Sequence, residues 1–252
     1  MALFTGNNLL RYDALDSTNT TALNLLREHP PEGTVVLTRH QTAGRGQQGS
    51  VWLTPPDVCL TFSVIYYPHF LDIRDLFQLS KLAALAVCDT LEHFLPDAPA
   101  AIKWPNDLLI ARRKVCGMLI ENQLEGQRLR ACVIGIGLNV NRQAFPPELA
   151  GIATAMDEWH AGVLESGHVL QYLLDRLETR YLALRAGGGE ALSQAYLGKL
   201  LGYQEPMRME TPDGTIEGVI LGVDRAGRLA VQAGASVQYF NIKEIRLIPG
   251  QL

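Results

Sequence analysis

Apolar and polar residues follow different periods in two parts of the chain. Up to about residue 199, short apolar runs typical of β-strands alternate with longer stretches in which apolar residues recur every three or four positions, as in amphipathic helices. The predicted strands are residues 9–12, 34–38, 59–67, 108–110, 119–121 and 132–138, and the predicted helices are residues 72–95, 169–184 and 191–200.

From Gly202 onwards the apolar residues recur at every second position. Short alternating segments are separated by turn sequences such as Pro212-Asp213-Gly214, which predicts about five short strands and a small β-barrel. We therefore expect two domains, residues 1–199 and residues 200–252.

Composition and charge exclude several classes of protein. The net charge of −4 predicts no strong non-specific attraction to nucleic acid or anionic lipid. The sequence has neither a signal-peptide pattern nor an apolar run of about 18 residues, so no membrane span is expected. The cysteines lack metal-binding spacing, so we expect no structural metal, and free buried thiols suit a reducing, cytoplasmic location; they are Cys59, Cys88, Cys116 and Cys132.

A glycine-rich segment, residues 42–52, follows the second predicted strand. Gly44, Gly46 and Gly49 allow main-chain N–H groups to approach a ligand closely, and consecutive N–H groups can bind an anion. Arg45 adds a fork of donors for a carboxylate or phosphate, and Trp52 offers a flat surface for stacking a base. The segment is neither a Walker A loop nor a GxGxxG motif, and taken alone it is equally well read as a flexible surface loop.

Other polar clusters lie at the ends of predicted elements and each has a simpler structural interpretation. Ser17-Thr18-Asn19 suits either a helix cap or the recognition of a neutral polar ligand. The string Lys103-Trp104-Pro105-Asn106-Asp107 and the later Lys114 carry charges that are otherwise typical of a solvated surface, and Asn139 is otherwise a turn residue.

In combination these motifs resemble the biotin protein ligases, over nearly the whole chain. The motifs that stand in the order and spacing of that family are Ser17-Thr18-Asn19, Gln41 with Gly44-Arg45-Gly46 through Gly49 and Trp52, Lys103 through Asp107, Lys114 with Gly117, and Gly135-x-Gly137-x-Asn139. The resemblance implies an α+β fold: a mixed-sheet catalytic domain, related to class II synthetases and lipoate ligases, followed by an SH3-like barrel.

The activity implied by the resemblance is ATP-dependent ligation of biotin. Biotin would be adenylated with ATP and Mg²⁺ and then transferred to a lysine of the biotin carrier domain of acetyl-CoA carboxylase or a related carboxylase. The implied catalytic residues are Lys114, Arg45 and Asp107. The implied biotin-binding residues are Ser17, Thr18, Asn19, Gln41, Gly44, Arg45, Gly46, Gln47, Lys114 and Gly117. The implied ATP-binding residues are Arg45, Gln47, Trp52, Lys103, Asn106, Lys114 and Asn139.

The chain departs from the family at three positions of the loop and lacks one segment. Gln47 stands where many members have arginine, which weakens the expected charge contacts of the loop. Gln48 and Ser50 replace basic residues that some members carry. The N-terminal helix-turn-helix of the repressor members is also missing, so we expect no specific DNA binding, and either a monomer or a homodimer.

The sequence leaves two alternative functions open and also predicts a movement of the glycine-rich loop. The rivals are a lipoate or octanoate ligase or transferase on the same fold, and a non-catalytic regulator that binds biotinyl-adenylate. The glycine content of residues 42–52 further predicts a loop that is poorly ordered without ligand and closes over the adenylate.

Overall fold

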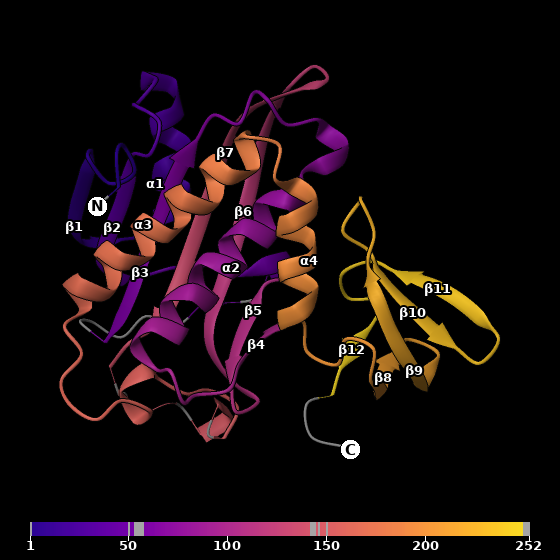
Figure 1. Ribbon diagram of the computed structural model, residues 1–252. Coiled ribbons are helices and arrows are strands. Elements are labelled where there is room, and N and C mark those ends of the chain that lie inside the picture. Colours follow the sequence, from indigo (N-terminus) through magenta and orange to yellow (C-terminus); the bar gives the residue numbers. More distant parts are fainter. Residues whose placement is uncertain are drawn as a thin grey trace.

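Two β-sheets organise the computed structural model, which describes residues 2–49, 51–52, 58–141, 145, 147–149 and 151–248 (Figure 1). The larger sheet has seven strands in the order β1-β2-β3-β7-β6-β5-β4. Its first two strands are parallel and all other neighbours are antiparallel, which confirms the predicted mixed sheet of an α+β fold. The strands are β1 (Leu9–Leu15), β2 (Val35–Gln41), β3 (Cys59–Tyr66), β4 (Ala100–Lys103), β5 (Asp107–Ile110), β6 (Arg113–Glu125) and β7 (Arg128–Asn139).

Helices cover both faces of this sheet. Phe62 and Val64 of β3 pack into the main core with α2 (Phe77–Phe94) and α3 (Ser166–Arg185), whereas Ile65 packs on the opposite face with Ala22 of α1 (Thr18–Leu25). Because successive side chains of a strand point to opposite faces, α1 and the pair α2–α3 lie on different sides of the sheet. Helix α4 (Gly189–Lys199) packs beside α2 (Figure 1).

The boundaries of several elements differ from the expected ones. The helix expected from residue 72 starts later, at Phe77, because Asp72 instead caps a short 3-10 turn, Ile73–Asp75, by accepting a hydrogen bond from the N–H of Arg74. The strand expected at residues 119–121 is the middle of the longer β6. Strand β6 follows β5 through a two-residue turn, in which Ala111 and Arg112 both have positive φ. Positive φ at both residues gives the turn the twist that matches its two strands.

The second sheet lies beside the first and is built from the C-terminal residues (Figure 1). Its five antiparallel strands, in the order β11-β10-β9-β8-β12, are consistent with an SH3-like domain and confirm the strands expected there. They are β8 (Pro206–Thr211), β9 (Gly214–Val223), β10 (Leu229–Ala233), β11 (Ser236–Phe240) and β12 (Arg246–Leu247).

Contacts from one inter-strand turn fasten the second sheet to the first. The indole N–H of Trp104 donates to the carbonyl of Gly227 at 3.0 Å, and Arg225 forms an ion pair of 2.5 Å with Asp75. A side chain at Gly227 would lie 2.5 Å from the Phe77 ring, so this close approach requires glycine. The two sheets are therefore held at a defined separation, with Trp104 between them.

Among the described residues, no helix is both long and apolar enough to span a membrane. The expected free, buried state of the four cysteines is confirmed.

The N-terminal segment is tied to α3 by one buried carboxylate. Glu178 accepts hydrogen bonds from the main-chain N–H groups of Leu3, Phe4 and Thr5. Burial by itself would raise the pKa of Glu178, but the three N–H groups together outweigh it and hold the pKa below its ordinary value of 4.5.

We therefore expect Glu178→Gln to lower the free energy of unfolding at neutral pH by about 2 kcal/mol, because hydrogen bonds to a charged acceptor are lost. A folded-state pKa below the unfolded one means that this contribution is present above the unfolded pKa and disappears as the pH falls through the folded pKa. Thermal melts of both proteins should thus converge as the pH is lowered below about 4.5. A constant difference between the two melting curves from pH 7 to pH 3 would contradict the role of the charge.

Candidate active site

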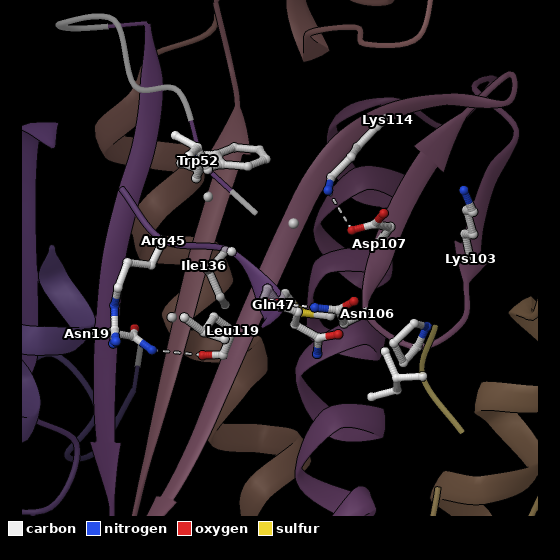
Figure 2. A pocket seen from close by; sticks show the side chains of 18 of the residues that line it. Asn19, Arg45, Gln47, Trp52, Lys103, Asn106, Asp107, Lys114, Leu119 and Ile136 are labelled. Carbon is white, nitrogen blue, oxygen red and sulfur yellow. Dashed lines mark hydrogen bonds and ion pairs between the residues drawn. The ribbon is translucent and has the colours of Figure 1, made fainter. Parts of the chain in front are cut away.

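A cavity of about 680 Å³ lies on the face of the seven-stranded sheet that carries α1 (Figure 2). Strands β3, β6 and β7 form its floor, and the start of α1 with the loop after β2 forms one wall. The β4–β5 hairpin forms the other wall, and residues between 242 and 247 of the second sheet complete the rim. The volume falls within the range of roughly 300–1,000 Å³ that is typical of small-molecule sites.

Neutral polar side chains from three elements are hydrogen-bonded to one another at one end of the cavity. The side-chain oxygen of Gln41 accepts from the N–H of Thr18 at 2.8 Å and from its hydroxyl at 3.2 Å. The Ser63 hydroxyl of β3 lies 2.8 Å from Thr18 Oγ1 and 2.6 Å from Asn19 Oδ1. These groups are buried and uncharged, so they suit a neutral polar ligand group and not an anion.

Ser17 precedes α1 at the N-cap position but makes no side-chain capping hydrogen bond. Its side chain is buried and lines the cavity. The capping interpretation of this serine therefore does not account for its hydroxyl.

Three glycines leave room above the floor for side chains from the walls. A Cβ atom at Gly135 would lie 2.0 Å from Asn19 Oδ1, and one at Gly137 would lie 2.3 Å from the Trp52 ring. A Cβ atom at Gly117, which pairs with Gly137 across β6 and β7, would lie 3.1 Å from both Trp52 and Lys114. Because these three positions lack side chains, the face of β6 and β7 toward the cavity has room for Asn19, Trp52 and Lys114.

The glycine-rich segment forms a closed loop over the cavity. The N–H of Trp52 donates to the carbonyl of Gly44 at 3.0 Å, and Arg45 pairs with Val51 as an antiparallel bridge. Gly46 and Gln47 line the cavity, whereas the Arg45 guanidinium turns to Glu121 of β6 at 2.7 Å. Ser50 of the expected segment lies outside the described residues.

Charged side chains gather at the other end of the cavity (Figure 2). Lys114 Nζ lies 2.7 Å from Asp107 Oδ1 and 5.5 Å from the centre of the Trp52 ring. Lys103, on strand β4, has its pKa lowered from 10.5, chiefly because burial disfavours its charge. The Asp107 carboxylate raises this pKa, and the nearby cations Lys114 and Arg246 lower it. An anion placed between these cations would be attracted by both lysines and would in turn stabilise their charged forms.

Comparison with known proteins identifies the family. The sequence model described as the Biotin/lipoate A/B protein ligase family matches residues 12–139. The chain is 35% identical over 244 residues to the bifunctional ligase/repressor BirA of Bacillus subtilis, covering 96% of this chain and 74% of that one. The chain belongs to the biotin/lipoate A/B protein ligase family.

Two further relatives resemble the chain over most of their own length. It is 30% identical over 237 residues to the biotin--[acetyl-CoA-carboxylase] ligase of Paracoccus denitrificans, covering 91% of this chain and 96% of that one. Among solved structures, the biotin protein ligase of Aquifex aeolicus in complex with biotin and ATP superposes with a TM-score of 0.79 at 27% identity, covering 96% of this chain and 99% of that one.

Most residues expected in the site of a family member are brought together in the cavity. They are Ser17, Thr18, Asn19, Gln41, Arg45, Gly46, Gln47, Trp52, Lys103, Asn106, Asp107, Lys114 and Gly117. Two expected residues are not among those that line it. A side chain at Gly44 would collide with the Trp52 carbonyl at 2.2 Å, so this glycine permits the loop closure, and Asn139 donates its amide to the carbonyl of Thr154 at 3.0 Å.

Sequence reasoning missed three polar residues of the sheet that line the cavity or contact its lining residues. Thr61 and Ser63 lie on β3 between the apolar residues that face the main core, and Glu121 lies on β6. The alternation of β3 was a usable signal, since polar residues at every second position of a buried strand mark a second environment on the opposite face. Thr61 also lines the cavity, and its hydroxyl, like the Trp52 N–H, is buried without a hydrogen-bond partner among the described residues.

The donor set of the cavity fits a bound nucleotide better than a directly bound metal. Lysine side chains and main-chain N–H groups of a glycine-rich loop are suited to phosphate oxygens. Within the described residues no group of three His, Cys, Asp or Glu side chains is arranged to hold a metal ion. A Mg²⁺ ion, which commonly keeps several waters and is bound through substrate phosphates, needs no such group.

Proposed function

We propose that the chain activates biotin as biotinyl-AMP with ATP and Mg²⁺ and transfers biotin to a lysine of a carboxylase carrier domain, in the cytoplasm. The proposal rests on one observation: a single cavity has neutral hydrogen-bonding groups such as Thr18 and Gln41 at one end, and two lysines, one of them ion-paired with Asp107, at the other. Biotin has the matching asymmetry, with a neutral ureido ring at one end and a carboxylate at the other. The relatives named for this reaction support the same assignment.

In the first step a carboxylate oxygen of biotin attacks the α-phosphorus of ATP, and the bond to pyrophosphate breaks. Two anions must meet, so cations placed beside them lower the barrier. We assign this task to Lys114, with Lys103 beside it and the main-chain N–H groups of Gly46 and Gln47 above. A Mg²⁺ ion bound through the phosphates would neutralise part of the triphosphate charge beside these lysines.

In the second step the amine of the carrier lysine attacks the acyl carbon of biotinyl-AMP, an amide bond forms, and AMP leaves. The attacking amine loses a proton, which passes to solvent as AMP leaves, and we assign the orientation of the amine to Asp107, which lines the cavity. The ureido ring is assigned to Ser17, Thr18, Asn19 and Gln41, and the adenine to the surface of Trp52.

We also place the domain division between Lys199, where α4 ends, and the strands of the second sheet.

The rival lipoate or octanoate activity fits the neutral polar end of the cavity, around Ser17 and Asn19, less well. An unbranched acyl chain placed there would bury the hydroxyl of Ser17 and the amide of Asn19 against methylene groups, which costs free energy for every hydrogen bond left unmade.

The deciding experiment is exchange of radiolabelled pyrophosphate into ATP with the purified chain. We expect exchange that requires both biotin and Mg²⁺, and transfer of biotin to a carboxylase carrier domain when one is added. Lipoate and octanoate serve as matched substrates. Exchange with either of these and none with biotin would assign the chain to the other branch of the family, and biotin binding without exchange would assign it a regulatory role.

A further inference from the structure

One carboxylate oxygen joins the loop after β2 to the start of α1, the two segments that form one wall of the cavity. Glu121 Oε2 accepts from Arg45 Nη2 of the loop at 2.7 Å and from Asn19 Nδ2 of α1 at 2.8 Å. The three residues come from β6, the loop and α1, which are far apart in the sequence. Figure 2 shows Arg45 and Asn19 next to each other on the same side of the site.

This carboxylate determines which way the Asn19 amide points. One N–H donates to Glu121 and another to the main-chain carbonyl of Leu119 at 3.1 Å, so both amide hydrogens are used. A flipped amide would place its oxygen against the carboxylate, where two acceptors repel each other. Only Oδ1, beside the Ser63 hydroxyl, remains to accept a further hydrogen bond, so Asn19 selects a ligand N–H and not a ligand carbonyl.

The same carboxylate holds the Arg45 guanidinium away from the charged end of the cavity. Arg45 therefore holds the loop to β6, and the adjoining Gly46 and Gln47 line the cavity. The pair is partly open to solvent, with 45% of the Arg45 side chain and 26% of the Glu121 side chain exposed. Such a contact is weak enough for the loop to open when product leaves.

We propose, resting on the proposed function, that Glu121 is a positioning residue that couples recognition of the ligand ring by Asn19 to closure of the Arg45 loop. A ligand N–H donated to Asn19 Oδ1 polarises the amide and strengthens its bond to Glu121, because successive hydrogen bonds in a chain reinforce one another. Glu121 in turn keeps Arg45 and the loop in place. Glu121 itself touches no substrate and does not line the cavity.

The test compares Glu121→Gln with Glu125→Gln, a matched change at the exposed end of the same strand. Glu121→Gln is expected to raise KM for biotin about tenfold, the effect of one hydrogen bond to a charged group, with kcat within about threefold of wild type. Hydrogen exchange of residues 42–49 in the ligand-free protein should be faster in Glu121→Gln and unchanged in Glu125→Gln. A KM for biotin and a loop protection both equal to wild type in Glu121→Gln would overturn the proposal.

A double-mutant cycle separates coupling from simple loss of structure. Asn19→Ala and Arg45→Ala should have non-additive effects on biotin dissociation in the wild-type background and additive effects in the Glu121→Gln background. Non-additivity that persists without the Glu121 carboxylate would show that another contact carries the coupling and would overturn the proposal. The exchange measurement needs no enzymatic activity, so its result is independent of whether the chain activates biotin.

Discussion

Lys114→Ala is expected to slow formation of biotinyl-AMP on the order of a hundredfold while biotin still binds. A cation about 4 Å from an anion is worth about 4 kcal/mol at an effective dielectric constant near 20, and solvent access to a side chain that is 33% exposed reduces this. The charge acts most strongly when the carboxylate and the α-phosphate meet, so the rate falls more than the affinity. Single-turnover adenylation and biotin binding, measured on the same preparation, check this.

The ion pair with Asp107 makes the Lys114 prediction more specific. In Lys114→Ala the Asp107 carboxylate is left without its 2.7 Å partner and repels the reacting anions, so Lys114→Ala/Asp107→Asn should recover part of the lost adenylation rate. Lys199→Ala is the control, because that lysine pairs with Glu92 at the end of α4, outside the residues that line the cavity. Adenylation by Lys114→Ala within about twofold of wild type would refute the assigned role.

Gly137→Ala is expected to lower kcat/KM for biotin about ten- to a hundredfold. The added methyl group would lie 2.3 Å from the Trp52 ring, a rigid side chain that can yield only if the loop or β7 moves. Overpacking of this kind costs about 1–3 kcal/mol, which is the origin of the expected factor. Pyrophosphate exchange at limiting biotin measures the effect.

Gly198→Ala is the matched control for Gly137→Ala. A Cβ at Gly198, which is in α4, would meet no heavy atom within 4 Å beyond its chain neighbours and the backbone of its own helix. This variant should therefore keep its activity and gain up to about 1 kcal/mol of stability. Equal kcat/KM for biotin in the two variants would show that activity does not require the Trp52 ring to lie in the space above Gly137.

Local sequence patterns predicted the elements of the fold well because each depends mainly on its own residues. The period-two segments after Gly202 became strands β8–β12, and the apolar runs of the first part became the central strands. The start of α2 was wrong by five residues, because Asp72 and the turn after it compete locally with the helix. The strands β4 and β5 form a hairpin around Trp104–Asn106 that the proline-containing sequence indicated only as an interruption.

Most residues of the cavity could also be expected from the sequence. Gln41, Gly117 and Lys114 were expected in the site because the order and spacing of the motifs resemble the family, and all three line the cavity; taken alone, Lys114 was typical of a solvated surface. The conformation of the expected loop without a ligand stays a prediction, and so does the domain division at residue 199.

The sequence by itself determined most of the strands and helices, the glycine-rich loop and the set of motifs that characterise the family. Only the tertiary structure decided that Ser63 lies under Thr18 and Asn19, that Glu121 holds Arg45, and that the second sheet closes the cavity. The physical reason is that these contacts join residues between 44 and more than 100 positions apart. They depend on the pairing register of β3, β6 and β7 and on the docking of α1 against the sheet, and no local pattern of residues encodes either.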